Sequence, residues 1–115
     1  MARYTSFYVI ACDPDRLGML LVDILQSCNF QILYENDDYI MAKEISPEVP
    51  FSKLVTVEVT LTKKYKYDEE VRMNVEVKTD ALPLHSDNHC RQMFDLVCEV
   101  IQDTRQWEIL EQAVG

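Results

Sequence analysis

Glycine is scarce in this chain of 115 residues, where it occurs only as Gly18 and Gly115. Loops that bind phosphate need several glycines, because their backbone must approach the ligand closely. The chain has no such loop, and it lacks the Gly-x-Ser-x-Gly motif of a nucleophilic serine. Gly18 falls within a predicted helix, where it either allows a close approach of helix and sheet or is simply tolerated. The sequence therefore predicts neither a nucleotide-binding loop nor a serine hydrolase of that class.

Positive charge is also scarce. The chain has 11 Lys and Arg against 20 Asp and Glu, which gives a net charge of −9. Nucleic acids and anionic membranes are both bound through Lys and Arg, so we expect no nucleic-acid partner and no membrane partner. One segment, Lys63 to Tyr67, interleaves basic and aromatic residues. The acidic residues Asp68, Glu69 and Glu70 follow it directly, which indicates a solvated hairpin tip.

Long apolar runs are absent. The longest, Phe7 to Cys12, is far shorter than the ~20 residues that span a bilayer. The first residues, Met1 to Ser6, lack the features of a signal peptide. Hydrophobic residues make up 48% of the chain and charged residues 27%, which is typical of a globular protein. We therefore expect residues 1–115 to form a single domain with a cytoplasmic location.

The four cysteines form no Cys-x-x-Cys pair, so we expect them to be buried apolar residues. A metal site is conceivable in one segment only, where His85, Asp87, His89 and Cys90 lie close in sequence. The alternative is that these are ordinary residues of a loop and a first helical turn, since no further ligands are apparent elsewhere. We favour the alternative and expect no metal, no cofactor and no enzyme activity.

The hydrophobic pattern predicts five strands and two helices. A helix begins after Asp13 with Pro14 at its first position and stops at Asn29. The second helix is predicted to begin at a cap on Ser86 or Asp87 and to run to about Gln112. The predicted strands are 3–11, 30–35, 38–45, 54–62 and 71–78. This order predicts an α+β fold of two layers, with an antiparallel sheet of about five strands and both helices on one face.

Two strand registers can be predicted. A two-residue turn at Asn36-Asp37 sets Tyr34 opposite Tyr39 and pairs Ile32 with Met41. For strands 54–62 and 71–78, the register that sets Glu58 against Glu76 is unfavourable. We therefore expect the alternative, in which Lys63 pairs with Glu69.

The order of elements is similar to that of TATA-binding-protein-like folds, including the small helix-grip domains. A second resemblance rests on sequence. SKLVTVEV (52–59), DNHCRQMFDLV (87–97) and the opening ARYTSF resemble a small uncharacterised protein family of cyanobacteria. This resemblance implies a bacterial cytoplasmic setting and no particular activity.

Strands 54–62 and 71–78 have polar outward faces, whereas the first three strands are apolar on both faces. A strand that is apolar on both faces is covered on both, which predicts a surface for a protein partner or a second copy. The residues expected on that surface are Tyr4, Tyr8, Ile10, Leu33 and Ile40. The alternative is that these are scattered apolar residues of an ordinary surface.

A second hypothesis is a carrier of a small apolar ligand, with a cavity between the sheet and the last helix. Its expected lining residues are Tyr34, Tyr39, Met41, Met73, Met93, Phe94 and Trp107, with Met19 beside them. Methionines and aromatic residues at this spacing are more often plain core. We therefore prefer the first interpretation, a non-catalytic domain that interacts with a protein partner or with a second copy of itself.

Overall fold

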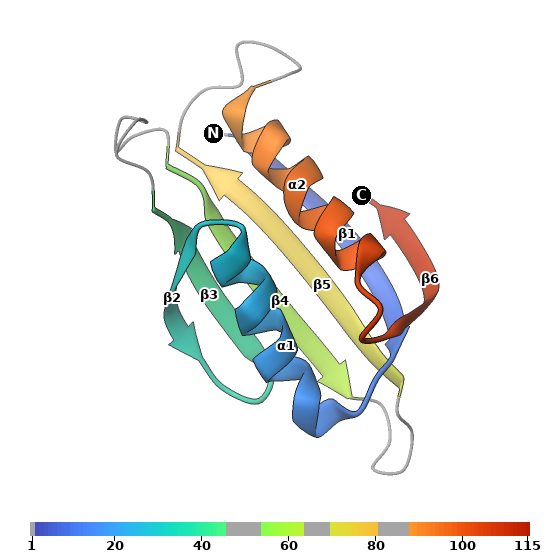
Figure 1. The fold of residues 1–115 in the computed structure, drawn as a ribbon. Coiled ribbons are helices and arrows are strands. Elements are labelled where there is room, and N and C mark those ends of the chain that lie inside the picture. Colours follow the sequence, from blue (N-terminus) through green and yellow to red (C-terminus); the bar gives the residue numbers. More distant parts are fainter. Residues whose placement is uncertain (1, 46–53, 64–69, 81–87) are drawn as a thin grey trace.

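The computed structural model describes residues 2–45, 54–63, 70–80 and 88–115. The described residues form one six-stranded antiparallel sheet and two helices. In chain order the elements are β1 (Ala2–Ala11), α1 (Pro14–Ser27), β2 (Phe30–Glu35), β3 (Tyr39–Glu44), β4 (Thr56–Lys63), β5 (Glu70–Thr79), α2 (His89–Asp103) and β6 (Glu108–Val114). The strand order across the sheet is β2-β3-β4-β5-β1-β6 (Figure 1).

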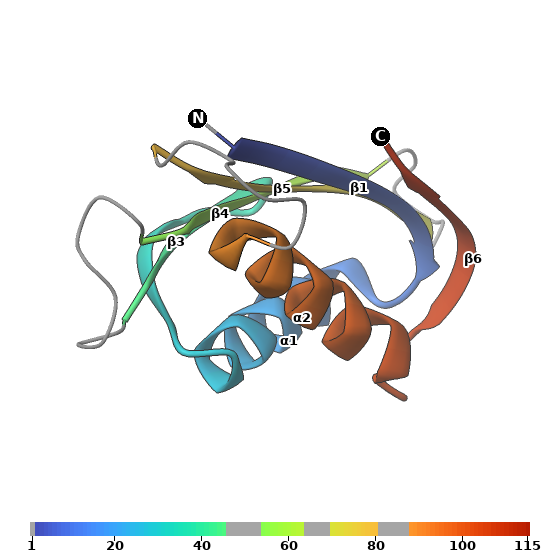
Figure 2. The same ribbon diagram turned by 90° about the horizontal axis from the view of Figure 1, so that it is seen from above.

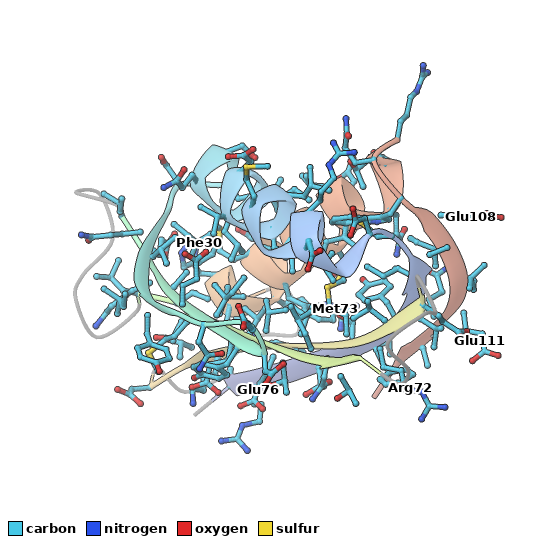
Figure 3. All side chains as sticks on the ribbon, turned by 90° about the horizontal axis from the view of Figure 1, so that it is seen from below. Phe30, Arg72, Met73, Glu76, Glu108 and Glu111 are labelled. Carbon is cyan, nitrogen blue, oxygen red and sulfur yellow. The ribbon has the colours of Figure 1, made fainter. Side chains whose placement is uncertain are left out.

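The sheet curves around the two helices, which both lie against its inner face (Figure 2). Side chains alternate between the two faces of each strand. On β5, Met73 points toward the helices, whereas Arg72 and Glu76 point away from them (Figure 3). The core lies between sheet and helices, and the largest side chains in it include Tyr8, Phe30 and Phe94. The expected two-layer α+β architecture is confirmed.

Helix α1 forms as its sequence predicts. Asp13 precedes it, and the carboxylate of this residue accepts a hydrogen bond from the Asp15 backbone N–H at 3.0 Å. After the last turn, Asn29 adopts a left-handed φ of 71°, which ends the helix without a glycine. Leu17, Leu21 and Leu25 lie on one face of the helix and are buried against the sheet. No helix among the described residues is long and apolar enough to cross a membrane.

The second helix is shorter than predicted, and its start differs as well. It begins after Asn88, whose side-chain oxygen accepts from the Arg91 N–H at 3.0 Å. The predicted caps, Ser86 and Asp87, lie outside the described residues. The helix ends at Asp103 and does not continue to Gln112, because residues 108–114 form β6 and pair with β1. The backbone of β1 thus gains a second partner, and this pairing outweighs the helical pattern of the segment.

The register of β2 and β3 also differs from the prediction. Ile32 lies opposite Ala42 and not Met41, and Tyr34 lies opposite Met41 and not Tyr39. Between these pairs the register shifts at Leu33, which is the extra residue of a β-bulge. The connection is Asn36–Asp38, in which the Asn36 side chain accepts from the Asp38 N–H at 2.8 Å. This turn is longer than the predicted one, and the bulge compensates for the added residue.

Strands β4 and β5 pair in the register that charge repulsion was expected to exclude. Glu58 lies opposite Glu76. Lys78 relieves the repulsion, because its ammonium lies 2.9 Å from the Glu58 carboxylate and 4.0 Å from that of Glu76. Arg3 of β1 adds a further cation at 3.1 Å from Glu76. Because the relief comes partly from β1, pairwise reasoning on β4 and β5 alone gave the wrong register.

This arrangement predicts the effect of removing the Lys78 charge. We expect Lys78→Met to lower the free energy of unfolding by about 1 kcal/mol, since it leaves two carboxylates facing each other on a partly exposed surface. Adding salt should recover most of the loss by screening the repulsion. Arg72→Met is the matched control, because Arg72 lies on the same strand and face and forms no ion pair with a described residue. Equal losses in the two variants, measured by urea unfolding, would contradict the arrangement.

Candidate functional site

The residues expected on the interaction surface do not lie together. Tyr8, Ile10 and Ile40 are at most 1% exposed and belong to the core between sheet and helices. Tyr4 also lies on the inner face, where its ring stacks on Phe94 with the centroids 5.7 Å apart. Only Leu33 is well exposed, at 53%. The prediction of a shared surface is therefore wrong, because the inner face of β1 and β3 is covered by the chain's own helices.

The residues expected to line a ligand cavity are divided by the sheet. Tyr34, Tyr39 and Met41 lie on the outer face, away from the helices. The remaining four pack in or against the core on the inner face: Met73, Met93, Phe94 and Trp107. Because a six-stranded sheet separates the two groups, they cannot line one cavity. The expected pocket is corrected to two unrelated sets of residues.

The structure places an exposed apolar surface at one edge of the sheet. We call it the hairpin surface, and it consists of Leu33 and Tyr34 of β2 with Tyr39 and Met41 of β3. Leu33 and Tyr34 are 53% and 55% exposed. The rings of Tyr34 and Tyr39 lie 6.0 Å apart, and Met41 lies opposite Tyr34. Burial, and next the negative charge of Glu58, raises the pKa of the Tyr39 phenol.

The hairpin surface lies beside an outer edge of the sheet. Strand β2 is the outermost strand of the sheet, and within the described residues it pairs only with β3. Figure 1 shows β2 at this border, with α1 on the inner side of the sheet. An outermost strand presents unpaired backbone N–H and C=O groups, which are a template for a further strand.

A buried carboxylate is bonded to a histidine where β3 ends and α2 begins. The Glu44 side chain is 5% exposed, and both its oxygens lie 2.8 Å from Nε2 of His89. One of these oxygens also accepts from the Val55 N–H at 3.2 Å. His89 is the first residue of α2, so the positive end of the helix dipole adds to the stabilisation of the carboxylate. The pair joins β3 to the start of the helix.

Cys90 adjoins this pair but is not activated by it. Burial, with a smaller contribution from the Glu44 charge, raises the pKa of the Cys90 thiol to about 11. A nucleophilic cysteine needs the opposite shift, because the thiolate is the reactive form. All four cysteines are buried and form no disulfide, and their burial is as the sequence predicts. The Glu44–His89–Cys90 arrangement therefore fits a structural contact better than a nucleophile with its base.

Glu44 is the residue that the sequence interpretation missed. It follows Ile40 and Ala42 on the inward face of β3, so its position in the alternation is that of a core residue. An acidic residue in such a position requires a partner, and the structure supplies His89. The described residues include no group of three side chains that could hold a metal ion. His85 and Asp87 of the predicted metal segment lie outside the described residues.

The raised pKa of Cys90 predicts a loss of stability in alkali. A group whose pKa is higher in the folded state stabilises the fold below its unfolded pKa of 9.0 and loses that contribution as the pH rises toward 11. Relative to neutral pH, we expect ionisation of Cys90 to cost about 1.4 kcal/mol near pH 10. Urea unfolding of the natural chain and of Cys90→Val at both pH values isolates this contribution. An equal alkaline loss in both proteins would contradict it.

Comparison of the chain with protein-family models and with curated proteins finds no match. The resemblances to a cyanobacterial family and to TATA-binding-protein-like folds stay predictions. Function must therefore be inferred from the exposed hairpin surface, the open edge of β2 and the buried pair described above.

Proposed function

We propose that this chain is a non-catalytic, cytoplasmic protein-interaction module that binds its partner through the hairpin surface. The observation that carries the proposal is the exposure of Leu33 and Tyr34 side by side on an outermost strand. Apolar residues exposed one by one are ordinary, but a contiguous group of them marks a contact surface. Tyrosine and methionine, which make up most of the hairpin surface, are enriched where proteins meet.

The open edge of β2 suggests how the partner binds. An extended segment can add to a free strand through backbone hydrogen bonds, while side chains beside the strand provide selectivity. The bulge at Leu33 interrupts regular pairing on the β3 side. Natural proteins protect free edges with charges, prolines, bulges or covering elements, and of these β2 has the bulge at Leu33. Phe30–Glu35 contains a single charged residue, Glu35 at its end, and no proline.

Catalysis and ligand transport receive less support. Burial keeps the Cys90 thiol protonated, and the thiol donates to the Val77 carbonyl, so Cys90 is not poised as a nucleophile although His89 precedes it in the chain. The alternative function, a carrier of an apolar ligand, required one cavity lined by residues that lie on opposite faces of the sheet. The net charge of −9 argues against nucleic acid as the partner.

A size measurement tests the proposal. In a gentle extract of cells that make the chain naturally, we expect it to elute in a complex larger than its own 13.5 kDa. Leu33→Glu should shift elution to the size of the free chain, because a buried charge at an interface is strongly unfavourable. Thr62→Glu is the matched control, since Thr62 is exposed on β4 outside the hairpin surface.

Thermal unfolding of the purified variants confirms that both are folded. The proposal is supported if only Leu33→Glu leaves the complex. It is overturned if the natural chain and both variants elute at the same size.

A further inference from the structure

A groove of about 560 Å³ lies between the outer side of α1 and the turn that joins β2 to β3. Helix α1 contributes Asp15, Gly18, Met19 and Val22 to its lining. The other wall is formed by Glu35, Asn36 and Asp37, which follow Tyr34 directly in the chain. The groove thus adjoins the end of β2, whose preceding residue, Tyr34, belongs to the hairpin surface on the outer face.

The groove is acidic. Three carboxylates line it, those of Asp15, Glu35 and Asp37, and all three residues are exposed. The ion pairs among the described residues lie elsewhere, so none of these carboxylates is neutralised by a described cation. Carboxylates that converge on a concave surface attract a positively charged ligand, and the net charge of −9 strengthens the attraction.

The groove also has an apolar part. Met19 is 61% exposed, although methionine is an apolar residue. Val22 lies one helical turn further on and packs partly against the core. Methionine is flexible and polarisable, and it is common on surfaces that bind apolar side chains of varied shape. The lining therefore suits a ligand that combines positive charge with apolar groups.

Gly18 supplies an observation that is independent of charge. A Cβ atom at this position would meet nothing within 4 Å, so the glycine does not serve a close approach of helix and sheet. That interpretation of Gly18 is wrong. A glycine inside a helix costs about 1 kcal/mol relative to alanine, and no packing contact compensates for this cost. The other interpretation, a tolerated position, is compatible with this open space, and the absent side chain leaves the wall of the groove open.

We propose that this groove binds a basic segment of a partner protein, with lysine or arginine side chains on its carboxylates and an apolar side chain on Met19. The proposal rests on the proposed function and names the chemistry of the partner. Charge complementarity selects this occupant. A second copy of the chain would bring a further net charge of −9 to an acidic groove, and a nucleic acid would be repelled in the same way.

The test uses the purified chain and a short synthetic peptide that alternates lysine and leucine. Amide chemical shifts should change at Gly18, Met19 and Asp37 and stay unchanged at Thr62. A peptide with glutamate in place of lysine should not bind, and neither should one with serine in place of leucine. Gly18→Leu fills the groove and should weaken binding about tenfold or more. Asp15→Asn combined with Asp37→Asn should have a similar effect, and added salt should weaken the binding to the natural chain.

We expect Gly18→Leu to stay folded, so that a loss of binding in this variant reports on the groove. Leucine is a better helix former than glycine and has open space here, so the thermal midpoint of this variant should not fall. Equal binding to the natural chain and to Gly18→Leu would overturn the groove proposal. Shift changes confined to other surfaces would do so as well. The elution experiment with Leu33→Glu does not depend on this result, so failure of the groove and failure of the interaction module can be told apart.

Discussion

Replacing Trp107 with alanine is expected to lower the free energy of unfolding by about 3–5 kcal/mol, the usual cost of removing a large aromatic side chain from a core. Trp107 is 8% exposed and lies between the end of α2 and the start of β6. Its indole N–H donates to the backbone carbonyl of Ile101 at 3.2 Å. This carbonyl belongs to the last turn of α2, where such groups lack a partner within the helix. Urea unfolding provides the measurement.

Two further variants show whether the effect comes from this junction. Trp107→Phe keeps much of the apolar contact but loses the donor to Ile101, so it should cost less than Trp107→Ala. Leu110→Ala, on the 46% exposed side chain of a β6 residue, should cost less than 1 kcal/mol. If Trp107→Ala cost no more than Leu110→Ala, the described burial of Trp107 between α2 and β6 would be contradicted.

Replacing His89 with alanine is expected to cost about 2–3 kcal/mol, because it leaves the Glu44 carboxylate buried without its principal partner. Only the Val55 N–H would then remain bonded to that carboxylate among the contacts described. The His89 side chain is 32% exposed, so its removal should cost less free energy of unfolding than the removal of a fully buried partner would. Chemical denaturation at neutral pH measures it.

Removing both partners should be less harmful than removing His89 alone. With leucine at both positions no buried carboxylate remains, so we expect Glu44→Leu with His89→Leu to recover much of the stability lost in His89→Ala. Glu44→Gln keeps the shape and an acceptor for Val55, so its cost should be smaller than that of His89→Ala. A double variant less stable than His89→Ala would show that the pair is not a simple buried contact.

The first half of the fold could be predicted from the sequence because its signals are local. Asp13, Pro14 and Asn29 mark the ends of α1 within a few residues of the helix itself. The end of α2 has no such mark. Residues 108–114 carry a pattern that suits a helix, and they become a strand only because β1, far away in the sequence, offers a free edge. A non-local pairing of this kind overrides local propensity.

The predictions of strand register were wrong because they, too, depend on parts of the chain outside the paired strands. The Glu58–Glu76 pair is acceptable once Arg3 of β1 and Lys78 are placed beside it, and the position of Arg3 depends on the whole strand order. At Leu33 the bulge depends on the length of the turn that follows. Asn36, Asp37 and Asp38 are all residue types that suit a turn, so the sequence does not determine whether the turn has two or three residues.

The candidate site was predicted only in part. The sequence shows that the first three strands are apolar on both faces, but it does not show which face the helices cover. Tyr8, Ile10 and Ile40 consequently lie in the core, and of the expected surface residues only Leu33 is well exposed. Tyr34, Tyr39 and Met41 were expected inside a pocket and lie on the outer face. Glu44 was detectable from its inward position on β3, since a carboxylate there requires a partner.

Crosslinking in the cell tests most directly whether the hairpin surface contacts a protein. A photoreactive phenylalanine analogue is placed at Tyr34 in one variant and at Thr62 in another, both on exposed positions of the sheet. On illumination, we expect the probe at position 34 to join the chain to another protein and the probe at position 62 to give no such product. No crosslinked product at position 34, or equal yields at the two positions, would contradict the proposed interaction module.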